Sequence, residues 1–98
     1  MKDKGKAEEV FTKLFGSTSR ARILVLLFEN AGRSFYQREI MYETSLSLQA
    51  VQRELLNLVD LGMVKRRENN ARVYYEVNPS SPLFAPFKDI LKVVDSPD

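Results

Sequence analysis

The feature that most constrains this chain is a change in the period of its apolar residues at Gly62. Before this glycine, apolar residues recur every three or four positions, which is the spacing of one face of an α-helix. After it, they alternate with polar residues, as in a half-buried β-strand. The helical series is Leu48, Val51, Leu55, Leu58 and Leu61, widened by Leu56 and Val59, and the alternating series is Val73, Tyr75 and Val77. The chain therefore joins an amphipathic helix to a β-hairpin.

The segment after Gly62 is long enough for two short strands. We expect strands at 63–68 and 72–77 with a turn at Asn69-Asn70-Ala71 between them. Asparagine tolerates positive φ better than most residues, so the Asn pair suits a hairpin tip. Pro79 and Pro82 end the second strand, because proline cannot donate to a ladder.

The remaining apolar patterns predict helices. They cover residues 7–15, 20–30, 36–43, 48–61 and 83–94, with a short extended piece at 33–35. Residues 20–30 are apolar nearly all round, which is typical of a helix at the centre of a core. Ser17 or Ser19 can cap this helix, Ser47 can cap the helix at 48–61, and Pro86 fits only a first turn or a kink.

Two short helices joined by a tight turn and followed by a β-hairpin describe a winged helix-turn-helix. We therefore expect a mainly α fold with a β-hairpin (α+β) and additional N- and C-terminal helices. The chain of 98 residues forms a single domain, residues 1–98, whose winged-helix core covers about 17–78.

The composition excludes several kinds of chemistry. The chain has no cysteine and no histidine, so disulfides, thiol nucleophiles, imidazole bases and Cys/His zinc sites are ruled out. Glu8 and Glu9 are adjacent on a helix and point in different directions, and no glycine-rich phosphate loop occurs. We expect no enzyme activity, no cofactor and no metal.

The hydropathy pattern predicts no membrane partner. No run of 18 apolar residues occurs, and the charged residues 1–6 precede no apolar stretch. We expect a cytoplasmic protein.

The basic residues gather in the predicted hairpin. Residues 62–77 hold Lys65, Arg66, Arg67 and Arg72 against Glu68 and Glu76. A basic segment in a chain of net charge +2 predicts a local anionic contact. The alternative is a solvated hairpin whose charges serve only solubility.

The helix at 48–61 is the candidate reader of DNA, because the second helix of such a pair exposes its N-terminal half to base edges. Glutamine can bond adenine, arginine can bond guanine, and alanine can contact a thymine methyl. The predicted reading residues are Ser47, Gln49, Ala50, Gln52 and Arg53, and the predicted hairpin contacts are Lys65, Arg66, Arg67, Asn69, Asn70 and Arg72. Arg20, Tyr36 and Arg38 are candidates for DNA phosphates. Alternatively, Arg53 pairs with Glu39, Arg20 is only solvated, and Tyr36 packs in the core.

The motifs resemble a known superfamily. They are Phe15-Gly16-Ser17-x-x-Arg20, Tyr36-Gln37-Arg38-Glu39-Ile40, the run 46–55, Leu58-x-x-Leu61-Gly62-Met63-Val64 and Tyr74-Tyr75-x-Val77-Asn78. Over 14–91 the chain resembles winged-helix transcriptional regulators of the ArsR/MarR superfamily. It is especially similar to small prokaryotic modules that occur alone or beside nucleotidyltransferase domains. The resemblance implies regulation of transcription through double-stranded DNA. Metal-sensing members use Cys and His ligands, so no metal response is expected here, and any small-molecule effector is unidentified.

The terminal helices carry more apolar residues than a minimal winged-helix core needs, and such surplus faces usually mark an interface. We expect a two-fold homodimer with Phe11, Leu14, Phe84, Phe87 and Leu91 in its interface. The alternative is a monomer in which both helices fold onto their own domain. A second function also stays open: a winged-helix module that docks a protein and binds DNA weakly.

Overall fold

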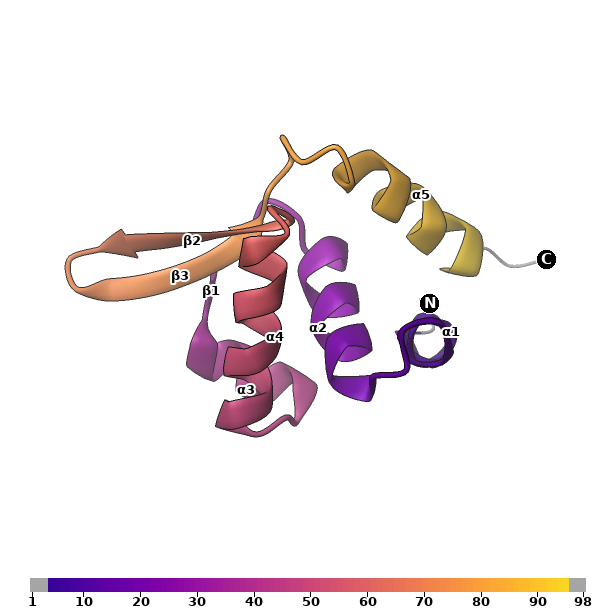
Figure 1. Ribbon diagram of the computed structural model, residues 1–98, viewed down its shortest axis with the longest axis horizontal. Helices are drawn as coiled ribbons and strands as arrows, with labels where there is room; N and C mark the ends of the chain where they lie inside the picture. The colour runs from indigo at the N-terminus through magenta and orange to yellow at the C-terminus, as the bar shows by residue number, and fades with distance from the viewer. Residues whose placement is uncertain (1–3, 96–98) are drawn as a thin grey trace.

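The computed structural model describes residues 4–95, and its elements follow the predicted order (Figure 1). The elements are α1 (Lys4–Phe15), α2 (Thr18–Glu29), β1 (Phe35–Tyr36), α3 (Gln37–Thr44), α4 (Leu48–Asp60), β2 (Val64–Asn69), β3 (Arg72–Val77) and α5 (Phe84–Asp95). The predicted helices and both hairpin strands are therefore confirmed. Most bounds differ from the predicted ones by one or two residues. The larger corrections are that α1 begins at Lys4 and that Tyr36 belongs to β1 and not to the helix that follows it.

Serine caps begin the two central helices. Ser17, and not Ser19, caps α2 by accepting a hydrogen bond of 3.1 Å from the backbone N–H of Arg20. Ser47 caps α4 in the same way, with a hydrogen bond of 3.1 Å from Ala50. Each serine satisfies an N–H that has no partner inside the helix, which stabilises the start of the helix.

The strands form an antiparallel sheet in the order β1-β3-β2. Because β2 continues through Asn69, the hairpin loop is Asn70 and Ala71, one residue shorter than predicted. Both loop residues have positive φ, 52° and 64°, as a two-residue hairpin turn of the right twist requires. The predicted alternation is confirmed at Val77, which is 3% exposed, and at Tyr75, which packs against the core.

Helix α2 lies at the centre of the fold. All residues from Ile23 to Phe28 are buried, as the all-round apolar pattern predicts. In Figure 1, α3 and α4 lie on one side of α2, α1 and α5 lie on the other, and the β2–β3 hairpin projects away from the terminal helices. The hairpin and α4 are thus held beside each other by one core.

The terminal helices pack on this core through aromatic rings. The ring centroid of Phe87 lies 5.7 Å from that of Phe11 and 5.3 Å from that of Phe28. Phe11 is 1% exposed and Leu91 is 5% exposed, so both are already covered by their own chain. The expectation that these two residues belong to a dimer interface is therefore wrong for this fold, whereas Leu14 remains 66% exposed.

Within residues 4–95, no helix combines the length and the apolar character needed to cross a bilayer.

Candidate nucleic-acid interface

Helix α4 presents two different faces. Val51, Leu55 and Leu58 are each at most 1% exposed and face the core. The exposed side chains of the helix include those of Gln49, Gln52, Arg53 and Asn57. Ala50 is half-buried, and the hydroxyl of Ser47 accepts the capping hydrogen bond. The glutamines and Arg53 are therefore accessible to a partner along the N-terminal half of the helix.

The buried stripe of α4 is narrower and shorter than expected. Leu56 does not widen it, because its side chain is 72% exposed, whereas Val59 packs partly against the core. The expectation was also wrong at the two ends of the stripe, where Leu48 is 44% exposed and Leu61 is 61% exposed. Leu56 follows Gln52 by one helical turn and shares its groove, so an apolar side chain stands at the edge of the polar face.

A groove of about 310 Å³ separates α4 from the hairpin. Its lining consists of Gln37, Gln52, Leu55, Leu56, Val59, Arg66 and Tyr75. Arg66 thus lies on the side of the hairpin that faces α4, opposite Gln52. Sequence alternation alone left open which of Arg66 and Arg67 faces this way.

Arg67 lies on the opposite, outer face of the hairpin. Its Nη2 is 3.1 Å from Oε1 of Glu76, and the hydroxyl of Ser34 also donates to Glu76. Lys65 stands directly across from Glu76 in the strand register. Glu76 therefore offsets part of the positive charge that Lys65 and Arg67 bring to this face.

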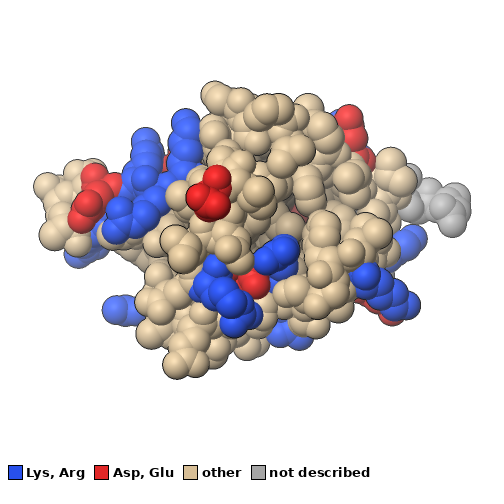
Figure 2. Space-filling view, viewed as in Figure 1, with Lys and Arg blue, Asp and Glu red and all other residues tan. Residues whose placement is uncertain are grey.

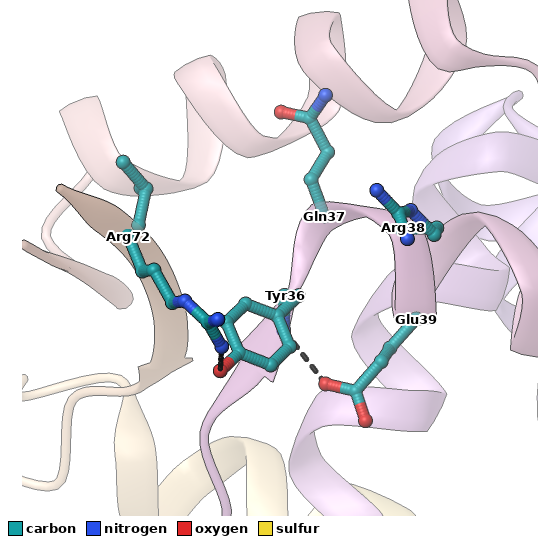
Figure 3. A pocket seen from close by; sticks show the side chains of 6 residues that line it. Tyr36, Gln37, Arg38, Glu39 and Arg72 are labelled. Carbon is teal, nitrogen blue, oxygen red and sulfur yellow. Dashed lines mark hydrogen bonds between the residues drawn. The ribbon is translucent and has the colours of Figure 1, made fainter.

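Arg72 continues the outer face and reaches Tyr36. Its Nη1 donates to the Tyr36 hydroxyl at 3.1 Å (Figure 3). The hydroxyls of Tyr36 and Tyr74 are 3.0 Å apart. The hydrogen bonds from Tyr74 and then from Arg72 lower the pKa of Tyr36 below its ordinary value, because they stabilise the phenolate. The bond to Tyr36 raises the pKa of Tyr74. Tyr36 thus joins the sheet to the start of α3, and it is neither a core residue nor an unengaged donor.

The first turn of α3 carries Arg38 and Glu39 beside this contact. Arg38 lines the same hollow of about 560 Å³ as Tyr36, Glu39 and Arg72 (Figure 3). Glu39 accepts a 2.8 Å hydrogen bond from the backbone N–H of Tyr36 and lies 3.4 Å from Arg33 Nη2. The alternative pairing of Arg53 with Glu39 is therefore wrong.

Arg53 instead shares an acidic partner with Arg20. Glu54 is 3% exposed, and its Oε1 accepts a 2.7 Å hydrogen bond from Arg20 Nε. Its Oε2 lies 3.4 Å from Arg53 Nε. Arg20 is therefore not simply solvated, because it ties α2 to α4.

Basic side chains gather at two places near α4 in the face seen in Figure 2. One group lies along the hairpin, and another, with acidic atoms between its members, lies over α2 and α4.

Carboxylates are the only strong metal ligands that this composition allows, since Cys and His are absent. Across residues 4–95, no group of three or more acidic side chains is placed to hold a metal ion. Glu54 and Glu76 are both engaged by arginines.

Comparison with known proteins supports the fold. No family model matches the chain, and no curated protein matches it. A crystal structure of a predicted DNA-binding transcriptional regulator from E. coli is similar, with a TM-score of 0.62 and 17% sequence identity over 87% of this chain and 86% of that chain. The chain has a winged helix-turn-helix fold. At this identity the likeness concerns the fold alone, and the resemblance to the ArsR/MarR superfamily rests on the sequence motifs.

In this winged helix-turn-helix, α3 and α4 are the helix pair and β2–β3 is the wing. The sequence pattern did not single out Glu54 or Gln37, and it assigned Leu56 to the buried side of the helix and not to the groove. Glu54 offered a signal, since it falls between Val51 and Leu58 in the buried stripe, where a charge needs a partner. No local pattern indicates that Gln37 lines the groove, because the docking of α3 beside α4 brings it there.

Proposed function

We propose that this protein is a sequence-specific, double-stranded DNA-binding transcriptional regulator. The observation that carries the proposal is the two-faced α4, with a buried apolar side and with Gln49, Gln52 and Arg53 exposed. An α-helix fits the major groove of B-DNA, and a helix anchored on its opposite side can hold its polar face against base edges. The E. coli neighbour, which is itself described as a predicted DNA-binding regulator, supports the same reading.

The two glutamines are the proposed base readers. Each can form two hydrogen bonds with an adenine edge, and exposed Leu56 can contact a thymine methyl. Ser47 and Ala50 shape the N-terminal end of α4, where the helix comes closest to the bases.

The wing residues are the proposed backbone contacts. Lys65, Arg66, Arg67 and Arg72 can meet phosphates or enter the minor groove, and Asn69 and Asn70 lie at the tip. Arg66 faces the α4 groove, whereas Arg67 and Arg72 have partners on the outer face. Arg38 at the start of α3 is a further candidate for a phosphate. Arg66 is accordingly the strongest candidate on the wing.

We also propose a two-fold homodimer through the terminal helices. One stripe of α5 is exposed and largely apolar, with Ile90 at 40% and Val93 at 75% exposure, and Leu14 on α1 is exposed as well. Asp89 and Lys92 stand on the exposed side of the same helix. If two α5 helices pack antiparallel about a point near Ile90, Asp89 meets the partner's Lys92. The stripe is thus complementary to itself, as a two-fold interface requires.

A protein-docking module is the second candidate. The groove between α4 and the wing is lined largely by apolar atoms of Leu55, Leu56, Val59 and Tyr75. Such a groove also fits an apolar side chain of a protein partner. The choice between the two depends on whether duplex DNA binds.

The other expectations accompany the DNA-binding proposal. We propose a non-enzymatic, cytoplasmic protein that needs no metal or cofactor. An effector, if one exists, is not a metal ion held by Cys or His, since the chain contains neither residue.

Fluorescence anisotropy tests the proposed function. Labelled duplexes drawn from mixed genomic fragments are titrated with protein at low salt, where phosphate contacts are strongest. We expect saturable binding that weakens as salt rises, and selection among the fragments then yields the operator. Absence of binding, with a known DNA-binding protein as positive control, would favour the protein-docking module.

A further inference from the structure

Arg20, Glu54 and Arg53 form a cluster whose hydrogen-bond geometry goes beyond what joining two helices requires. One carboxylate bonds two arginines from two helices, at 2.7 Å on Oε1 and 3.4 Å on Oε2. Both contacts use the Nε–H of the guanidinium. An arginine presents its N–H donors in a planar fork, so a guanidinium bonded through Nε keeps its Nη donors for another acceptor.

The negative charge of the cluster is buried, whereas its two positive charges are closer to solvent. The side chain of Glu54 is 4% exposed, whereas those of Arg20 and Arg53 are 35% and 61% exposed. An anion that approaches this surface meets the two guanidinium groups and not the carboxylate. The cluster also carries one net positive charge, because one carboxylate offsets only one of the arginines.

The position of the cluster relates it to the reading face. Arg53 directly follows Gln52 on the exposed side of α4, and Arg20 lies in the first turn of α2 behind the Ser17 cap. The two side chains therefore bridge the start of the central helix and the proposed recognition helix. Duplex DNA bound along α4 would bring a phosphate strand close to that bridge.

We propose that Arg20 and Arg53, oriented by buried Glu54, form a two-arginine site for a single backbone phosphate of duplex DNA. This proposal rests on the proposed function. Under this proposal Arg53 binds a phosphate and does not read a base. This role fits a guanidinium whose Nε–H already donates to a carboxylate. Glu54 is a positioning residue that holds both planar forks toward one acceptor, and arginine forks match the oxygens of a phosphate.

The test measures how DNA affinity depends on salt for the full chain and its variants. Binding to a specific and a non-specific duplex is followed by anisotropy at several KCl concentrations. The variants are Arg53→Ala, Arg20→Ala and the double variant, and Lys13→Ala on α1 removes an exposed charge far from α4 as the matched control. Arg53→Ala keeps the 2.7 Å bond between Arg20 and Glu54, so this variant tests the site without breaking the tie between the helices.

For Arg53→Ala we expect affinity for both duplexes to fall by the same factor, about tenfold or more. The slope of log affinity against log salt should fall by about 0.9, the share of one phosphate. Arg20→Ala should act in the same way, and the double variant should lose no further slope, because the two arginines share one phosphate. Lys13→Ala should leave the slope unchanged. Circular dichroism verifies that each variant is folded.

Three results would overturn the site. A slope loss of about 1.8 in the double variant would mean two separate phosphates. A loss confined to the specific duplex with an unchanged slope would make Arg53 a base reader and leave the proposed function standing. If the wild-type protein binds no duplex at low salt, the proposed function fails and the phosphate site fails with it.

Discussion

Arg20 on α2 and Glu54 on α4 are joined by a 2.7 Å hydrogen bond across 34 residues of sequence. It fixes the proposed recognition helix to the helix at the centre of the core, at a point next to the exposed Gln52 and Arg53. A buried carboxylate without this partner would lose a charge-assisted hydrogen bond, which is among the stronger kinds in proteins.

The first prediction concerns the stability of this connection. Arg20→Ala should lower the free energy of unfolding by about 1–2 kcal/mol, a range reduced for the 35% exposure of the arginine side chain. Urea denaturation followed by circular dichroism measures the change. Lys13→Ala, an exposed change of the same charge, should stay within about 0.5 kcal/mol of wild type. Equal stability of the two variants would show that the bond contributes nothing measurable.

The second prediction concerns base reading. Gln52→Ala should weaken binding to the operator by about 1–3 kcal/mol and leave non-specific binding nearly unchanged, because a lost base contact affects only the matching sequence. Gln49→Ala should behave in the same way. Parallel titrations of operator and random duplex give the ratio of the two affinities. If neither glutamine alters that ratio, α4 is not the reader.

The third prediction separates the two arginines of β2. Arg66 lies in the α4 groove, while Arg67 is held by Glu76 at 3.1 Å on the outer face. Arg66→Ala should therefore weaken binding to all duplexes and reduce the salt slope by about 0.9. Arg67→Ala should have a smaller effect. Wild-type affinity and slope in both variants would show that the hairpin does not contact DNA.

The fourth prediction concerns assembly. Val93 is 75% exposed, so Val93→Asp should leave the fold intact and convert a dimer to a monomer in sedimentation equilibrium at tens of micromolar. Asp89→Lys should weaken the dimer by placing like charges together. The double exchange Asp89→Lys/Lys92→Asp should restore it, because an antiparallel pairing of α5 recovers the opposite charges. A wild-type monomer at these concentrations would refute the dimer.

The fifth prediction concerns the tyrosines. The bonds from Tyr74 and Arg72 place the pKa of Tyr36 below the ordinary value of about 10. A pH titration of phenolate absorbance should show an early step that Tyr36→Phe removes and Arg72→Ala shifts upward. Because the folded pKa of Tyr36 is the lower one, its ionisation adds stability as pH rises through that folded value, whereas the raised pKa of Tyr74 acts in the opposite direction.

Tyr42 provides the control for this titration. Its ring is 83% exposed, so Tyr42→Phe removes one phenol without touching the contacts of Tyr36 and should leave the early step in place. If the early step persists in Tyr36→Phe, the hydroxyl contacts do not lower the pKa of Tyr36 in solution.

Local sequence alone determined the order of elements in this protein. The period change at Gly62, the caps at Ser17 and Ser47 and Asn70 at the hairpin tip act over a few residues, so they can be read without knowledge of the fold. The two faces of α4 were also largely predicted, since helical spacing decides which side is apolar. The expectation that Leu56 is buried was wrong, because the exposure of this side chain depends on how closely the hairpin approaches α4.

Only the tertiary structure decided which distant residues meet. Phe11 and Leu91 are buried because α1 and α5 pack together, and β1 exists because Phe35 pairs with Tyr75 far along the chain. Which arginines pair with Glu54, and whether Arg66 lies on the side of the hairpin next to α4, likewise depend on how whole elements dock. Apolar burial drives that docking, and it is non-directional, so no local pattern specifies which polar groups it brings together. The sequence by itself determined the helices, the hairpin and the polar face of α4, and docking decided the charge pairs that surround that face.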